Sequence, residues 1–218
     1  MIGVVIPAHN EERWLEACLL SVLAAAAHPL LQAEPVKVVV VLDSCSDASR
    51  AIAEGFAITV LEVNARSVGV ARAAGARVLI EAGARWLACT DADTTVPADW
   101  LAAQLAHDAD AVCGVVEVDD WSAHHPQVRD RYEACYTDRD GHSHIHGANL
   151  GVTSAAYLRA GGFPALACHE DVHLVRALQA LGAKIAWSRS VRVSTSARLD
   201  FRAQGGFGSY LVGLASSA

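Results

Sequence analysis

The stretch "VKVVVVLD" at residues 36–43 decides how this chain must fold. From Val38 to Leu42 it is an unbroken aliphatic run, and it stops at Asp43. β-Branched side chains favour strands, and a strand without alternating polar residues is buried on both of its faces. The stretch therefore predicts an inner strand of a parallel sheet that is covered by helices and ends on a carboxylate.

The segments on either side repeat an alternation of strand and helix with short connections. Further strands are predicted at residues 2–6, 57–63 and 85–90. Helices are predicted at residues 11–27, 47–55 and 67–83, and Gly83 is a C-terminal cap for the last of them. This order predicts an α/β fold with a mostly parallel sheet and helices on both faces.

The second half of the sequence is less regular. Its predicted elements are helices at 97–107, 154–162 and 170–182, strands at 110–118 and 145–153, and one or two strands within 184–196. Residues 119–145 are polar, rich in His and weakly periodic, which is typical of a functional or mobile segment. Because no linker or repeat is visible in the 218 residues, we expect one domain.

The composition argues against several classes of protein. The formal net charge is -7, whereas a general nucleic-acid binder needs a basic face. No apolar run reaches the length of about 18 residues that a membrane-spanning helix needs. The N-terminus reads as a strand without a basic region, so we do not expect it to be a signal peptide. Six cysteines without a C-x-x-C pair are typical of reduced thiols, and we expect a cytoplasmic protein.

Acidic residues follow three of the predicted strands. Ligands of an open parallel sheet bind beyond the carboxyl ends of its strands, where residues 7–11, Asp43, Asp91 and Asp93 would converge. Asp91 and Asp93 would repel each other unless a cation lies between them, and carboxylate oxygens suit Mg²⁺ or Mn²⁺. The alternative is that one aspartate caps the next helix while the other is solvated.

Three other groups have both a functional and a structural interpretation. Asp43 can accept N–H groups from a nucleobase, or it can cap the helix near residue 47. Glu170 and Asp171 can act as a general base in a cleft, or they can be ordinary acids of a first helical turn. The histidines of "HSHIH" would share one face of a strand and could bind a metal, although ordinary surface or core positions are the favoured explanation; they are His142, His144 and His146.

Six ordered motifs resemble those of the family 2 glycosyltransferases, which have the nucleotide-sugar-binding fold called GT-A. Together they run from residue 4 to residue 182. They are "VVIPAHNEE", "VVVLDSCSD", "VGVARAAG", "TDADTTVPADWL", "GANLGVTSAAYLRAGGF" and "HEDVHLVRALQALG". The resemblance implies a three-layer α/β/α sandwich with a Rossmann-like sheet and a smaller antiparallel portion. Residues 1–93 would form the nucleotide-binding half, and residues 94–218 the acceptor-binding half and C-terminal segment.

The resemblance also implies roles for individual residues. Asp93, with Asp91, would carry Mn²⁺ or Mg²⁺. Asp171 would be the inverting catalytic base, with Glu170 beside it. The donor would be a nucleotide-diphosphate sugar and the acceptor a hydroxyl compound. The residues implied in holding the donor are Pro7, Ala8, Asn10, Glu11, Asp43, Arg72, Asp91, Gly147 and Asn149.

The sequence departs from the family pattern at several positions. Leu42 stands where the family has an acid, and Ala73 where it has Asn. A late His that many members use as a metal ligand is missing, and the same region carries Arg198 and Arg202, which can contact phosphate or lie at the surface. The final segment "SYLVGLASSA" is predicted to be a packed helix, with weak membrane contact as the alternative.

These departures leave other functions open. A protein of the same fold that binds a nucleotide sugar without transferring it would tolerate the changes at Leu42 and Ala73. A sugar nucleotidyltransferase would need a Gly-rich, basic loop where this chain has the acidic "PAHNEE". A retaining transferase is a further variant of the same fold. The sequence does not indicate the sugar, the acceptor or the oligomeric state.

Overall fold

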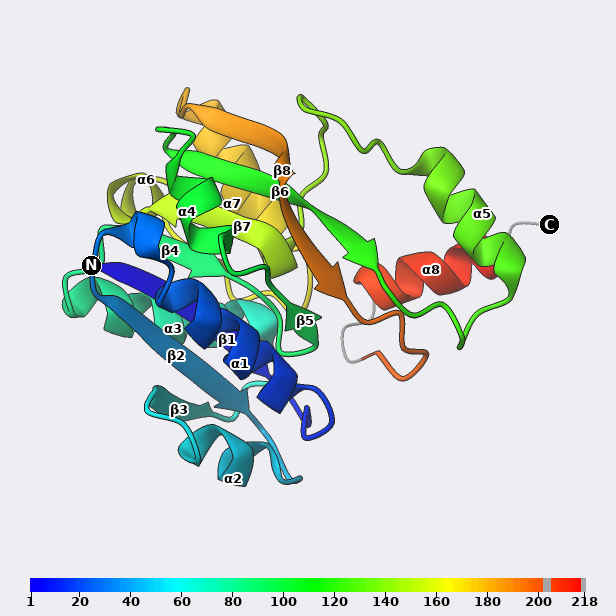
Figure 1. Ribbon diagram of the computed structural model, residues 1–218, viewed down its shortest axis with the longest axis horizontal. Coiled ribbons are helices and arrows are strands. Elements are labelled where there is room, and N and C mark those ends of the chain that lie inside the picture. Colours follow the sequence, from blue (N-terminus) through cyan, green and yellow to red (C-terminus); the bar gives the residue numbers. More distant parts are fainter. Residues whose placement is uncertain (202–204, 217–218) are drawn as a thin grey trace.

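The computed structural model describes residues 1–201 and 205–216 (Figure 1). Its strands are β1 (Ile2–Ala8), β2 (Val36–Asp43), β3 (Thr59–Val63), β4 (Trp86–Cys89), β5 (Thr94–Thr95), β6 (Ala111–Val118), β7 (Leu150–Thr153) and β8 (Ile185–Thr195). Its α-helices are α1 (Leu15–Ala26), α2 (Ser49–Glu54), α3 (Val68–Glu81), α4 (Trp100–Leu105), α5 (Pro126–Cys135), α6 (Ser154–Arg159), α7 (Glu170–Ala180) and α8 (Phe207–Ser216).

Eight strands form one sheet in the order β3-β2-β1-β4-β7-β6-β8-β5. The strands β3, β2, β1 and β4 are parallel, as the sequence predicts. Strand β7 runs antiparallel to both β4 and β6, and β5 runs antiparallel to β8. The mixed sheet with helices on both faces is the arrangement that the resemblance described above implies.

Alternate side chains of the inner strands point into two separate cores. Val38 and Val40 of β2 pack in the core beneath α1 and α4, whereas Val39 and Val41 pack in the core beneath α3 and α7. Helix α3 lies very close to the sheet, because a Cβ on Gly75 would come within 2.8 Å of the Val5 side chain. Two buried faces explain why residues 38–42 carry no polar alternation.

The structure corrects the prediction for residues 119–145, which contain helix α5. Pro126 begins this helix, and the ring of His125 accepts a hydrogen bond from the Gln127 N–H at 3.4 Å. The sequence of this helix shows little hydrophobic periodicity, because the helix is highly charged and buries only Val128 and Tyr132. A His-Pro pair before a charged run was the one available signal.

Two further predictions were too long. The strand predicted at 145–153 is limited to β7, and a short 3-10 helix, η2 (Gly147–Asn149), precedes it. The helix predicted from residue 11 begins only at Leu15, because residues 11–14 form a turn in which the Trp14 N–H donates to the Glu11 carbonyl at 2.9 Å.

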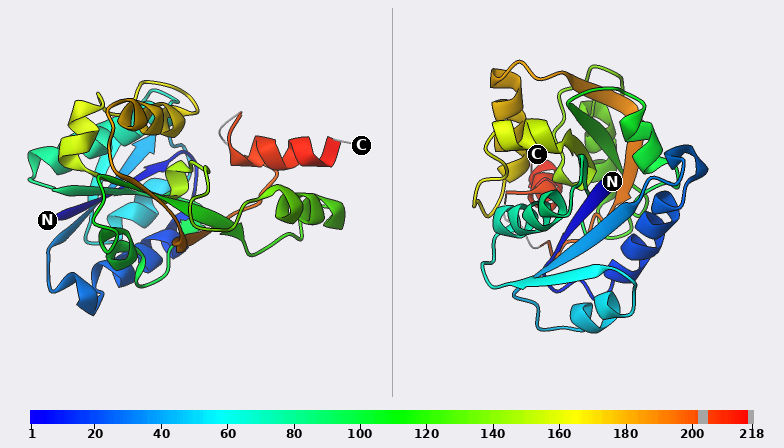
Figure 2. Two further views of the ribbon diagram at one scale, coloured as in Figure 1. Left: turned by 90° about the horizontal axis from the view of Figure 1, so that it is seen from above. Right: turned by 90° about the vertical axis from the view of Figure 1, so that its left-hand side faces the viewer.

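Helices α5 and α8 pack together at the end of the molecule farthest from the N-terminus (Figure 2). Tyr132 of α5 and Leu211 of α8 are buried in a small third core with Ala197. The Arg131 side chain also donates to the Leu214 carbonyl at 2.5 Å. As predicted, the C-terminal segment forms a packed helix over its described residues, Phe207–Ser216. Within residues 1–201 and 205–216, no helix has both the length and the apolar character needed to cross a bilayer.

Candidate active site

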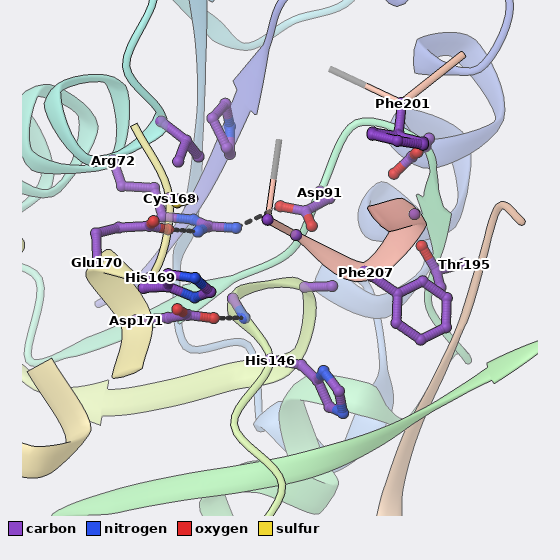
Figure 3. A pocket seen from close by; sticks show the side chains of 18 of the residues that line it. Arg72, Asp91, His146, Cys168, His169, Glu170, Asp171, Thr195, Phe201 and Phe207 are labelled. Atoms are coloured by element: carbon purple, nitrogen blue, oxygen red, sulfur yellow. Dashed lines mark hydrogen bonds and ion pairs between the residues drawn. The ribbon is translucent and has the colours of Figure 1, made fainter. Parts of the chain in front are cut away.

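A pocket of about 910 Å³ opens at the carboxyl ends of β1, β2 and β4 (Figure 3). Most of its lining residues come from the segments 7–11, 66–72, 91–93, 143–148 and 167–172, and from described residues between 195 and 210; the others are Asp43, Val116, Tyr136 and Arg176. Both halves of the sequence therefore contribute to one cavity, at the edge of the sheet where the strand-end acids were predicted to meet.

Arg72 of α3 is a buried cation in this pocket (Figure 3). Its guanidinium pairs with Asp91 and with Glu170. The side chains of Arg72 and Glu170 are only 4% and 2% exposed, whereas that of Asp91 is 37% exposed. Burial opposes the charge of Arg72, but the two carboxylates outweigh it and raise the pKa of the guanidinium. Arg72 thus joins the end of β4 to the start of α7.

Glu170 and Asp171 both lie in the first turn of α7 but have different surroundings. Burial raises the pKa of Glu170, against the opposing effect of Arg72. Asp171 is partly exposed and accepts hydrogen bonds from the Gly147 N–H at 2.6 Å and the Val172 N–H at 2.7 Å. Glu170 is therefore a buried counter-ion, and Asp171 is the more accessible carboxylate.

Gly147 lies directly against the Arg72 guanidinium. A Cβ at this position would come within 2.2 Å of Arg72 Nη1, so no side chain fits there without moving the arginine. Because its N–H also holds Asp171, Gly147 connects the buried cation to the accessible acid.

Arg198 is a second arginine that bridges two acids at the same edge. Its guanidinium contacts both oxygens of Glu11, at 2.5 and 2.6 Å, and Asp93 Oδ2 at 3.2 Å. Burial, Asp91 and Glu11 raise the pKa of Asp93 to about 7, although Arg198 opposes the shift. Both members of the D-x-D pair thus have an arginine partner, Asp91 in Arg72 and Asp93 in Arg198. Arg202 lies outside the described residues.

Asp43 ends β2 and fixes the loop before α3. Its carboxylate accepts the backbone N–H groups of Ala65, Arg66 and Ser67 at 2.8, 2.8 and 2.7 Å. Burial disfavours the charged form, but these donors outweigh it and lower the pKa of Asp43. The acid therefore stabilises residues 65–67, a structural role that differs from the predicted cap near residue 47. It also lines the pocket with Pro7 and Ala8.

Asn10 and Asn149, which the resemblance implied in donor binding, are not among the residues that line the pocket. The Asn10 side chain accepts the Ser46 N–H at 2.7 Å. Asn149 is completely buried, accepts from Trp100 Nε1 at 2.9 Å and donates to the carbonyls of Val115 and Val191. In this structure Asn149 joins η2 to β6 and β8 beneath the site.

The three histidines of "HSHIH" form a stacked column on an irregular segment, not one face of a strand. Tyr136 stacks on His144 with ring centroids 4.0 Å apart and contacts His146 Nε2 through its hydroxyl at 3.0 Å. His144 and His146 line the pocket, whereas His142 is buried. Among the residues that the structure describes, no group of three or more His, Cys, Asp or Glu side chains is arranged to hold a metal ion.

Two aromatic residues of the pocket lining were not singled out from the sequence. Phe201 and Phe207 lie across the pocket from Glu170 and Asp171 (Figure 3). His169, just before α7, lines the pocket with a left-handed backbone φ of 65°. The sequence gives no periodic signal for these residues, because they lie outside regular elements or at helix ends.

Comparisons with solved structures identify the fold. A mannosyltransferase, PcManGT from Pyrobaculum calidifontis in complex with GDP-Man and Mn²⁺, aligns with TM-score 0.69 and 22% identity over 96% of this chain and 59% of that one. S. aureus TarS in complex with UDP-GlcNAc aligns with TM-score 0.68 and 18% identity over 94% of this chain and 61% of that one. The chain thus spans about three fifths of the length of both neighbours.

Sequence comparison gives the family. No curated protein sequence matches the chain. The family model described as glycosyl transferase family 2 matches residues 3–162, which is more than half of the chain. The pocket at the carboxyl edge, the GT-A neighbours and this match agree, and the chain belongs to glycosyl transferase family 2.

Proposed function

We propose that this protein is a metal-dependent, inverting glycosyltransferase that moves a sugar from a nucleotide-diphosphate sugar to a hydroxyl acceptor. The observation that carries the proposal is the presence of Asp91, Asp93 and Asp171 around one pocket at the carboxyl edge of the sheet. Two structural neighbours with the same fold are complexes with UDP-GlcNAc and with GDP-Man and Mn²⁺, which supports a nucleotide-sugar donor.

The nucleotide would lie over the ends of β1 and β2. Pro7, Ala8 and Asp43 line this part of the pocket, and Glu11 and Arg72 line the part nearer the D-x-D pair. Asn10 and Asn149 would act indirectly, by holding the 44–47 turn and the η2 segment. We further propose that residues 1–93 form the donor half and residues 94–218 the acceptor half of one domain in a cytoplasmic protein.

The carboxylates of Asp91 and Asp93 fit a hard cation, because both present oxygen atoms to the pocket and such ions prefer oxygen ligands. Two carboxylates leave coordination positions that diphosphate oxygens and water can fill. A bound Mn²⁺ or Mg²⁺ would offset the charge that develops on the departing nucleoside diphosphate.

Asp171 would be the catalytic base. The N–H groups of Gly147 and Val172 donate to its carboxylate and fix its position in the pocket. The carboxylate takes the proton of the acceptor hydroxyl, the hydroxyl oxygen bonds to the anomeric carbon, and the bond from that carbon to the diphosphate oxygen breaks. Attack from the face opposite the leaving group inverts the anomeric configuration.

A panel of nucleotide sugars, with release of nucleoside diphosphate in the presence of Mn²⁺ as the readout, tests the proposal. Slow hydrolysis by water makes the test independent of the acceptor. We expect Asp171→Asn to lower kcat by about 10²–10⁴-fold without weakening donor binding. Asp108→Asn, on an exposed loop, is the matched control and should leave kcat unchanged.

Three results would change the proposal. An Asp171→Asn variant with undiminished activity would show that Asp171 is not the catalytic base. A product that retains the anomeric configuration of the donor would show that the transferase is not inverting. Tight donor binding without turnover of any donor would favour the non-catalytic alternative.

A further inference from the structure

Arg198 contacts Asp93, one of the two proposed metal ligands, and also Glu11. Its guanidinium forms a bidentate contact with Glu11 and a third contact, of 3.2 Å, with Asp93 Oδ2. The side chains of Arg198, Glu11 and Asp93 are 11%, 6% and 16% exposed. The cluster is thus an ion-pair network in the pocket wall, partly shielded from water, in a position that a divalent cation would also favour.

The sheet brings Arg198 to this position. Thr195 pairs with Thr94, their hydroxyls lie 2.9 Å apart, and the Ser196 N–H donates to the Asp93 carbonyl at 3.2 Å. Arg198 follows three residues after this pairing, so its backbone is fixed beside Asp93. Within the described part of the chain, its Nε is buried without a hydrogen-bond partner, and its guanidinium contacts the carboxylates of Glu11 and Asp93. The guanidinium therefore retains a donor that a new acceptor can use.

The contact with Asp93 is the one that can be exchanged. Glu11 receives two short contacts, whereas Asp93 receives a single longer one. A cation bound to Asp93 and the positive guanidinium would repel each other across a few ångströms. Phosphate oxygens are equally good partners for a guanidinium fork, and Arg198 lines the cavity in which a diphosphate would lie.

We propose that Arg198 is a tethered cation that competes with the divalent metal for Asp93 and transfers to the diphosphate of the donor when both are bound. The inference rests on the proposed metal role of Asp93. Without nucleotide, a metal ion would have to displace Arg198 from the Asp93 carboxylate. Without metal, a nucleotide would have to draw Arg198 away from Asp93. With both ligands bound, Asp93 would hold the metal and the Arg198 guanidinium would contact the diphosphate. Metal and nucleotide therefore bind cooperatively, and each raises the affinity of the other by the same factor.

The test measures Mn²⁺ binding to the full chain by the loss of the free-ion electron paramagnetic resonance signal, with and without UDP, and with GDP as a second nucleotide. We expect Arg198→Gln to bind Mn²⁺ alone about 10-fold more tightly than the wild type, because Asp93 is released. The factor by which the nucleotide tightens Mn²⁺ binding should fall about 10-fold, because the phosphate has lost its guanidinium partner. Arg198→Lys, which keeps the charge but loses the fork, should give intermediate values.

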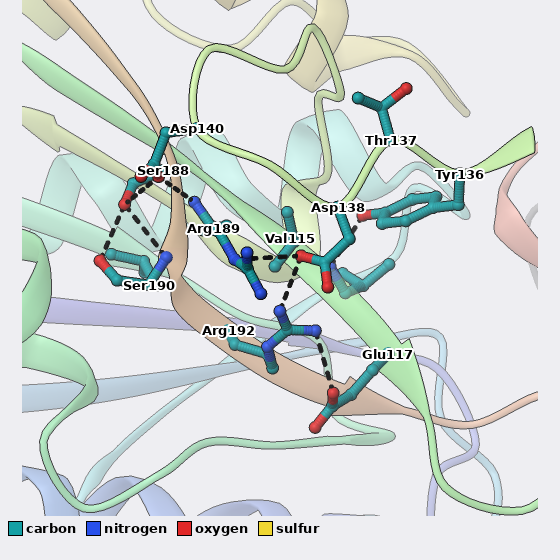
Figure 4. Close-up of polar contacts among 12 residues, drawn as sticks. Val115, Glu117, Tyr136, Thr137, Asp138, Asp140, Ser188, Arg189, Ser190 and Arg192 are labelled. Atoms are coloured by element: carbon teal, nitrogen blue, oxygen red, sulfur yellow. Dashed lines mark hydrogen bonds and ion pairs between the residues drawn. The ribbon is translucent and has the colours of Figure 1, made fainter. Parts of the chain in front are cut away.

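Arg192→Gln is the matched control. Arg192 lies on β8 and pairs with Glu117 and Asp138, away from the pocket that holds Arg198 (Figure 4). This variant should leave both affinities unchanged, which separates the local contact from a general change in charge. Thermal unfolding of each variant verifies that it is folded.

Two results overturn the inference, and they are distinguishable. If Arg198→Gln binds Mn²⁺ no more tightly than the wild type does and keeps the full coupling to the nucleotide, Arg198 does not exchange Asp93 for the diphosphate. The proposed metal role of Asp93 is not affected by that result. If Asp93→Asn binds Mn²⁺ as well as the wild type does, the metal role of Asp93 is wrong, and the inference fails with it.

Discussion

Two of the arginines that line the pocket, Arg72 and Arg198, each bridge two acids, but their surroundings differ. Arg72 is buried on helix α3, and its partner Glu170 is almost fully buried. Arg198 follows the end of β8 on an extended segment, and Asp93 keeps access to the pocket. Breaking a fully buried pair leaves an uncompensated charge, whereas a pair at a pocket wall can exchange partners. We therefore expect Arg72 to support the fold and Arg198 to respond to the ligand.

Arg72→Met should give the largest effect on stability. Glu170 would be left as an unpaired buried charge, which costs about 3–5 kcal/mol of unfolding free energy. Urea unfolding followed by circular dichroism measures the loss. The double variant Arg72→Met/Glu170→Gln should recover part of it, because no buried charge then remains. A loss below about 1 kcal/mol, typical of a surface pair, would contradict the structural role of Arg72.

Gly147→Ala tests the same cluster from the other side. The added Cβ must displace the Arg72 guanidinium, which should cost about 1–3 kcal/mol of unfolding free energy. Urea unfolding again provides the measurement. The control is Gly213→Ala, where a Cβ would meet nothing within 4 Å and a helical alanine is favourable. Equal stability of the two variants would show that Gly147 does not constrain Arg72.

The pH dependence of stability tests the Arg198 cluster. Because the folded pKa of Asp93 is raised from 3.8 to about 7, the folded state holds a proton that the unfolded state releases between these values. The contribution of Asp93 to stability is complete below pH 3.8 and is lost as the pH rises through 7.

In excess chelator, Asp93→Asn should therefore be more stable than the wild type at pH 8, by about 1–2 kcal/mol, and should lose this advantage at low pH. Urea unfolding of both proteins from pH 4 to pH 8 provides the measurement. Parallel stability curves for the two proteins would show that Arg198 already compensates Asp93 fully.

The smallest effect is expected for Arg192→Gln. The side chain of Arg192 is 30% exposed, and the acids it contacts, Glu117 and Asp138, are 47% and 41% exposed. Ion pairs of this kind contribute about 0–1 kcal/mol. Urea unfolding should find a change in this range. A larger loss would mean that the Asp138 contact holds the segment that carries Tyr136 and His144 (Figure 4).

The sequence by itself determined the parallel half of the sheet and the acids at its edge. An unbroken aliphatic run such as residues 38–42 is compatible with few environments, because both of its faces must be buried. The positions of Asp43, Asp91 and Asp93 follow from where the strands end. Their meeting at one pocket could therefore be predicted from strand order alone.

The tertiary structure decided which partners these acids have. Arg72 is 98 residues from Glu170, and Arg198 is 187 residues from Glu11. No local pattern encodes such pairs, because ion pairing depends on distance in space and not on spacing along the chain. The same limit applies to Asn149, whose amide joins β6 and β8, and to α5, which depends on α8 to cover its short apolar stripe. Local residue patterns thus determine the strands and their polar ends, whereas contacts between residues far apart in the sequence determine the counter-ion of each carboxylate.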